Sequence, residues 1–231
     1  MPSSPNSLVA SWGHARRGLH AIGDGHSVRD VVLAAHATPD RKYHTLQHLQ
    51  QCLSVVETVS HLPDRPAEVE MARWFHDAIY EFKGANNEAR SADWAHEELR
   101  RADVDPAVAA RVRDLAPMTC HASNLHRTDE QLLVDIDLAI LGAEPARFAE
   151  CEQQIREELA RVPSYGLRTK RKSVFKPFLD RETIYSTQVL HQKLEARARN
   201  NLASALAGQI KEDAADAGLK HGEPCRHPST P

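Results

Sequence analysis

Two histidines and an adjacent histidine–aspartate pair are the residues whose types and spacing point most directly to chemistry. His44 and His48 lie four residues apart, and His76 and Asp77 stand side by side in the apolar run WFHDAI. An ionised aspartate in such a setting is costly unless a partner compensates its charge. A divalent metal ion is the commonest partner of clustered His and Asp side chains. This part of the chain therefore predicts one half of a metal site.

A further carboxylate ligand is expected from the segment QLLVDIDLAILG, residues 131–142. On a helix, Asp135 and Asp137 point about 200° away from each other, so they cannot both face one site. The residues three and four positions from Asp137 are all aliphatic, and a metal ion would remove the penalty of a carboxylate on that buried face. Asp135 has mixed neighbours, so we expect it to support the ligands from behind or to form an ion pair. The predicted ligands of a divalent ion (Mn, Mg, Ni, Co, Fe or Zn) are His48, His76, Asp77 and Asp137.

The periodicity of the apolar residues predicts helices throughout the chain. In residues 43–60 they recur at steps of three and four, which is typical of an amphipathic helix and puts His44 and His48 on one face. Residues 67–81 show a second such pattern, with His76 on its inward face. No alternating strand pattern longer than a few residues occurs. We therefore expect an all-α fold, a helical bundle with the site between central helices and other helices at 8–19, 28–37, 88–101, 105–115, 131–142, 144–160, 167–179 and 182–207.

Length and composition are those of an ordinary soluble protein. The 231 residues are 41% hydrophobic and 26% charged, which suits one domain with a real core. We expect a partly helical N-terminal segment (1–27), a helical domain (28–207) and a disordered tail (208–231). The net charge of -3 provides no basic field for nucleic acid, and no apolar run approaches the roughly 20 residues that span a bilayer. Without a signal-like N-terminus or a CxxC pair, the expected location is the reduced cytoplasm.

Several motifs occur in the order known from one protein family. They are RKYHTLQH, WFHDAIYE, NNEARSA, DIDLAILG, IREEL and FLDRETIY, and they cover roughly residues 40–205. In these motifs the chain resembles the predicted metal-dependent HD phosphohydrolases of bacteria, a branch of the HD superfamily. The resemblance implies an HD-domain helical bundle, the same four metal ligands and phosphoester hydrolysis. Two positions depart from the pattern: Asn86 stands where an acidic residue is common, and Leu159 where an aromatic residue is usual.

The expected reaction is hydrolysis of a small phosphorylated substrate such as a nucleotide. A bound metal ion, held in part by Asp77, would activate a water molecule and polarise a phosphoryl oxygen. The YHxxxH spacing is similar to that of cyclic-nucleotide phosphodiesterases, and this likeness makes His44 the acid that protonates the leaving oxygen. Glu88 could orient a water molecule or a second metal ion. Candidate contacts to the substrate are Arg41, Lys83, Asn87, His121, Arg171 and Arg181.

Several of these roles have a plainer alternative. His44 could be a surface or helix-capping residue, and Asn87 with Glu88 could do no more than begin a helix. Arg171 belongs to the basic run RTKRK, which is typical of a solvated face, and Arg181 could tie the last helices together.

Two other functional classes stay open. An HD-type di-iron oxygenase needs more histidine ligands, for which His121 and His126 are available. A non-catalytic HD module would bind a nucleotide or a partner without turnover. The oligomeric state is also open, because the apolar last helix could serve a dimer as well as the core.

Overall fold

Each helix expected from the sequence has a counterpart in the computed structural model, which describes residues 5–81, 84, 86–115, 125–160 and 164–220. Within these residues all regular structure is helical, which confirms the all-α prediction. None of the helices described is both long enough and apolar enough to cross a bilayer. The elements are α1 Pro5–Gly18, α2 His26–Ala35, α3 Leu46–Val59, α4 Pro66–Phe75, α5 Asn87–Arg101, α6 Pro106–Leu115, α7 Thr128–Asp137, the 3-10 helix η2 Leu138–Gly142, α8 Pro145–Glu158, α9 Ser164–Asp180 and α10 Gln188–Lys220.

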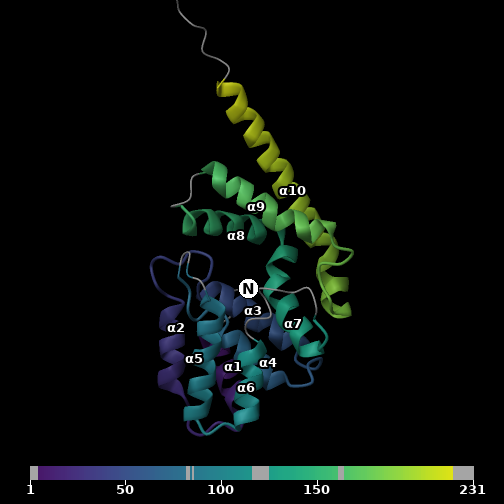
Figure 1. Cartoon of the computed structure of the whole chain (residues 1–231). Helices are drawn as coiled ribbons and strands as arrows, with labels where there is room; N and C mark the ends of the chain where they lie inside the picture. The colour runs from purple at the N-terminus through teal and green to yellow at the C-terminus, as the bar shows by residue number, and fades with distance from the viewer. Residues whose placement is uncertain (1–4, 82–83, 85, 116–124, 161–163, 221–231) are drawn as a thin grey trace, which may run out of the picture.

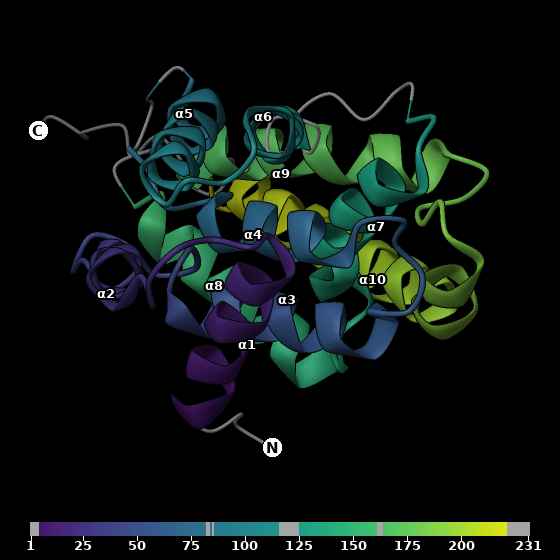
Figure 2. The same ribbon diagram turned by 90° about the horizontal axis from the view of Figure 1, so that it is seen from below.

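Helix α4 lies at the centre of the molecule, with α1, α3, α5, α6 and α7 packed around it (Figure 2). Every residue of α4 from 67 to 75 is buried, although three of them carry charge. Glu68 pairs with Arg111 of α6, and Glu70 accepts a hydrogen bond from Ser11 of α1. The third charge, Arg73, lies in the candidate site described below. A helix buried on all sides thus keeps its charges by pairing each one with another helix.

Helix α1 belongs to the same core as the helices that follow it. Trp12 is 2% exposed, and its ring meets the edge of Trp74 with centroids 5.1 Å apart. The indole nitrogen of Trp74 also donates to Ser11 Oγ at 3.0 Å. The boundary expected after residue 27 therefore does not separate two cores.

The two helices that carry the predicted ligands are shorter than expected. Helix α3 begins at Leu46, so His44 precedes it, and α4 ends at Phe75, so His76 and Asp77 lie in the turn that follows. In this turn the N–H of Ala78 donates to the carbonyl oxygen of Phe75 and the N–H of Ile79 donates to Ser91 Oγ, both at 2.9 Å, so the α-helical hydrogen bonds stop. The buried guanidinium of Arg41 holds the turn by donating to the backbone carbonyl oxygens of Asp77 at 2.6 Å and Ala78 at 3.0 Å.

Asp135 has a structural role instead of the expected supporting role at the site. Its buried carboxylate accepts the backbone N–H of Ser186 at 2.8 Å and of Thr187 at 2.7 Å, and the Thr187 hydroxyl at 2.6 Å. This contact fixes the start of α10 against α7. Helix α10 then continues to Lys220, beyond the expected end at residue 207, and its far end projects from the body of the molecule (Figure 1). The helix-forming Ala, Glu and Lys residues of this last stretch explain the extension.

Candidate metal centre

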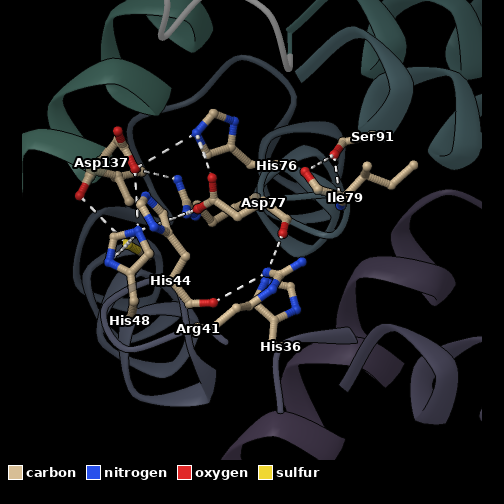
Figure 3. A network of polar contacts seen from close by, with 12 residues as sticks. His36, Arg41, His44, His48, His76, Asp77, Ile79, Ser91 and Asp137 are labelled. Carbon is tan, nitrogen blue, oxygen red and sulfur yellow. Dashed lines mark hydrogen bonds and ion pairs between the residues drawn. The ribbon is translucent and has the colours of Figure 1, made fainter. Parts of the chain in front are cut away.

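The four predicted ligands converge from three parts of the fold. His48 comes from α3, His76 and Asp77 from the turn after α4, and Asp137 from the end of α7, and their side chains point toward one another (Figure 3). His48 Nε2 lies 3.4 Å from Asp77 Oδ2 and 3.5 Å from Asp137 Oδ1. His76 Nε2 lies 3.6 Å from Asp77 Oδ1 and 3.8 Å from Asp137 Oδ1. Donor atoms that share one cation at about 2.1 Å lie roughly 3.0–3.4 Å apart, so these spacings are only slightly wider.

A buried arginine, which the sequence analysis did not include, lies among these ligands. Arg73 is 1% exposed and donates to Asp137 Oδ1 at 2.7 Å and to Asp77 Oδ2 at 2.8 Å. Its Nη2 atom also lies 3.1 Å from His48 Nε2. The spacing of four residues between Arg73 and Asp77 was the sequence signal for this contact.

Both carboxylates of the site are ionised. Burial alone would raise the pKa of Asp77, but the charges and hydrogen bonds of His76, His48 and Arg73 outweigh it and hold that pKa well below its usual value. For Asp137 the effect of burial is outweighed in the same way, chiefly by Arg73 and His48, and its pKa is also lowered. Arg73 balances only one of the two negative charges. The negative charge that remains, together with imidazole and carboxylate donors, fits a divalent transition metal or Mg²⁺.

Within the described residues, two combinations of three side chains bring possible ligand atoms within 4.8 Å of one another. One is His76 with Asp77 and Asp137, and the other is His48 with Cys52 and Asp137. The buried thiol of Cys52 lies 3.8 Å from the ring nitrogens of His48. Cys52 is one helical turn after His48, so its proximity was also predictable from spacing.

His44 is held beside this centre by a distant carboxylate. Its Nδ1 atom lies 2.6 Å from Oε1 of Glu158, at the end of α8. The other oxygen of Glu158 accepts the backbone N–H groups of Lys42, Tyr43 and His44 at 2.8, 2.9 and 3.2 Å. Tyr80 stacks on the His44 ring at 4.2 Å. The imidazole is therefore fixed in place, with its ring centroid 6.0 Å from that of His48.

Glu158 is itself buried, with only 2% of its side chain exposed. Its hydrogen bonds favour the charged form of the carboxylate. Burial would raise its pKa, but the hydrogen bond and charge of His44, with Tyr80 and the backbone of Lys42, lower it strongly. In the sequence, the IREEL run that contains Glu158 is informative only as a family motif. Nothing in the local pattern could link Glu158 to His44 across 114 residues.

The arginines predicted to contact phosphate have other partners. The terminal nitrogens of Arg41 donate to three backbone carbonyls, those of Asp77, Ala78 and His44. Its side chain thereby fastens the turn that carries His76 and Asp77 to the segment that carries His44. Arg171 forms an ion pair with Glu152 on α8 and lies over the ring of Phe175. Arg181 lies over the ring of Phe178, at 4.7 Å.

The remaining predicted residues are placed as follows. Asn87 is the first residue of α5, not its cap, and donates through Nδ2 to the backbone oxygen of Glu81 at 2.9 Å. Asn86 occupies the cap position, with φ 70° and no side-chain cap bond. Glu88 lies in the first turn of α5. The predictions for Lys83 and His121 fall outside the described residues.

Two cavities lie along α1, and neither is lined by a predicted ligand. One, of about 270 Å³, lies between α1 and α3, and the other, of about 280 Å³, lies beside α1 and the start of α4.

In comparisons with protein-family models, curated proteins and solved structures the chain matches none, so its likeness to the HD phosphohydrolases rests on sequence motifs alone.

Proposed function

We propose that the chain is a metal-dependent phosphohydrolase that acts on a nucleotide or another small phosphoester. The observation that supports this most strongly is the convergence of two imidazoles and two ionised carboxylates beside a histidine anchored by a buried glutamate. When bound, a divalent cation supplies Lewis acidity, which lowers the pKa of a water molecule and polarises a phosphoryl oxygen.

The residues of the chain have separate tasks in this reaction. Asp77 and Asp137 attract the cation and keep their charge because of Arg73. Water attacks phosphorus as the bond from phosphorus to the leaving oxygen breaks, and that oxygen needs a proton to leave as an alcohol. His44 delivers the proton from Nε2, because its Nδ1 atom is held by Glu158. Glu158 keeps the ring oriented.

A substrate screen tests the proposal. Purified protein is incubated with phosphomonoesters, phosphodiesters and nucleoside phosphates in the presence of Mn²⁺, Mg²⁺, Ni²⁺ or Co²⁺. We expect hydrolysis of at least one class that EDTA abolishes. Asp77→Asn should be inactive, whereas Asp93→Asn, which changes an exposed carboxylate on α5, should retain activity.

Two results would exclude the proposal. A folded protein that binds metal but hydrolyses none of these esters would favour a non-catalytic binding module. Two iron ions per chain together with oxygen consumption would favour the oxygenase class.

A further inference from the structure

The cavity of about 270 Å³ between α1 and α3 lies outside the candidate metal centre. Helix α1 packs along α4 and also contacts α3 (Figure 2). The walls of the cavity are formed in part by the apolar side chains of Leu8, Leu53 and Val56. A cavity with apolar walls and a few polar groups is the usual form of a small-molecule site. The polar groups therefore indicate which ligand the cavity would accept.

One of these polar groups is the carboxylate of Glu70, which α4 contributes to the cavity. The side chain of Glu70 is only 8% exposed. Its Oε1 atom accepts a hydrogen bond from Ser11 Oγ at 2.6 Å, and its Oε2 atom lies 2.5 Å from His14 Nδ1. A carboxylate has about four acceptor sites, so each oxygen can accept a further hydrogen bond from a ligand in the cavity.

The charge of Glu70 is compensated less well than the other charges of α4. Glu68 binds the guanidinium of Arg111 at 2.6 and 2.9 Å, and Arg73 is held between two carboxylates. The partners of Glu70 are a neutral hydroxyl and the imidazole of His14, which is 59% exposed and charged only when protonated. Within the described residues no arginine or lysine forms an ion pair with Glu70. A buried carboxylate in this state favours a cationic ligand.

A second carboxylate, that of Glu57, lines the cavity from α3. Glu57 follows Leu53 by four residues, so the two side chains lie on one face of the helix. Leu53 and Val56 are buried, whereas Glu57 is exposed. This wall of the cavity therefore passes from buried apolar side chains to a charged group in solvent. The described residues that line the cavity include no arginine or lysine to oppose the two carboxylates.

We propose that this cavity binds a short aliphatic diamine. One ammonium group donates to Glu70, and the other pairs with Glu57. The methylene groups between them lie against Leu8, Leu53 and Val56. The inference is independent of the proposed function, since none of the described lining residues is a predicted metal ligand.

The size and charge of the cavity fit this class of ligand. At about 30 Å³ for each water-sized group, the cavity holds roughly nine such groups, which is enough for a diamine of four or five carbons. An anion would be repelled by both carboxylates. A neutral ligand would leave the charge of Glu70 uncompensated.

Calorimetric titration of the full-length protein with 1,4-diaminobutane, in EDTA to exclude metal ions, tests the inference. We expect saturable binding of one molecule per chain. 1-Aminobutane should bind about three- to fivefold more weakly, because it lacks the ion pair with the exposed Glu57. 1,4-Butanediol has the same chain length and no charge, and it should not bind.

Three variants test whether the diamine occupies this cavity. Glu57→Gln should abolish the preference for the diamine over 1-aminobutane, whereas Glu97→Gln, which changes an exposed glutamate on α5, should preserve it. Glu70→Gln should weaken binding of both amines by more than about tenfold, because it removes the charged acceptor. Ala10→Phe places a ring at an exposed position of the cavity wall and should block both amines.

The binding data can also contradict the inference. No saturable binding of the diamine below about 10 mM, or equal affinity for the diol, would overturn it. Unchanged affinity in Ala10→Phe would overturn it as well, and so would a preference for the diamine that persists in Glu57→Gln. If Glu70→Gln does not fold, these two variants at exposed positions still decide the question.

Discussion

The proton donor of the proposed reaction, His44, is held by Glu158, which lies 114 residues away in sequence. Glu158 holds His44 Nδ1 at 2.6 Å and receives three backbone N–H groups from the segment that contains His44. The same carboxylate therefore orients the imidazole and fixes the backbone that carries it. Such a residue should matter most when the leaving group cannot depart without a proton.

Replacing Glu158 with glutamine should change the rate in a way that depends on the leaving group. We expect a fall of about 10²-fold for alkyl phosphoesters, because an alkoxide needs the proton from His44. A p-nitrophenyl ester should be affected much less, since nitrophenolate leaves without a proton. Steady-state kinetics on both esters, with the exposed Glu157→Gln as control, make the comparison. An equal loss for both esters would show that Glu158 is purely structural.

A second residue-scale expectation concerns His36, which is 1% exposed and whose Nδ1 atom lies 3.0 Å from the backbone oxygen of Val32. Burial lowers the pKa of His36 to about 4. The unfolded chain, with a histidine pKa of about 6.5, binds this proton first, so folding stability falls as the pH drops through this window. Between pH 7.5 and 5 the loss should be about 2 kcal/mol.

Urea denaturation at the two pH values measures this loss. His36→Gln should remove that part of the pH dependence, whereas His61→Gln, at an exposed position, should leave it unchanged. An identical pH dependence in His36→Gln would mean that other groups cause the acid sensitivity.

At the scale of elements, α7 shows how two aspartates two residues apart serve different parts of the fold. Asp135 anchors the start of α10, and Asp137 faces the candidate site. The helical angle between them was readable from sequence, as was the choice of Asp137. The partner of Asp135 was not, because Ser186 and Thr187 lie more than fifty residues away and have no pattern of their own.

Alanine substitutions should separate the two roles. Asp135→Ala leaves three donors without their acceptor, two of them buried, and should cost about 2 kcal/mol or more in unfolding free energy, with Mn²⁺ affinity unchanged. Asp137→Ala should weaken Mn²⁺ binding by more than about tenfold. Urea denaturation and calorimetry on both variants check this. Loss of Mn²⁺ affinity in Asp135→Ala would show that Asp135 takes part in metal binding.

The ends of α3 and α4 could not be predicted from the local sequence pattern. Apolar periodicity predicted both helices, but it continued them through His44 and past Asp77. At the end of α4 the N–H of Ile79 donates to Ser91 Oγ on α5 instead of to the carbonyl oxygen of Phe75, and Arg41 binds the carbonyls of the turn from a different part of the chain. Long-range contacts of this kind override local preference, and they place the site residues in turns.

For the whole molecule, the helical class followed from periodicity, whereas the arrangement around α4 did not. A helix that is buried on every side looks amphipathic in sequence, because Glu70 and Arg73 lie about 60° apart and are read as a polar face, while Glu68 lies on another side. Their partners come from α6, from α1 and from the site itself. The N-terminal helix is consequently part of the core, although its sequence alone suggested a separate segment.

The internal charge of Arg73 also predicts how the whole fold responds to metal. Many small metal proteins unfold when the ion is removed, because nothing else compensates their ligands. Here Arg73 bridges Asp77 and Asp137 directly, so the protein should remain folded in EDTA. Mn²⁺ at 100 times its dissociation constant should then add about 2.7 kcal/mol to the free energy of unfolding. Thermal denaturation should show a melting temperature higher by roughly 5–10 °C, a shift that Asp137→Ala abolishes. Unfolding in EDTA, or an equal shift in Asp137→Ala, would show that the centre does not link metal binding to the fold in this way.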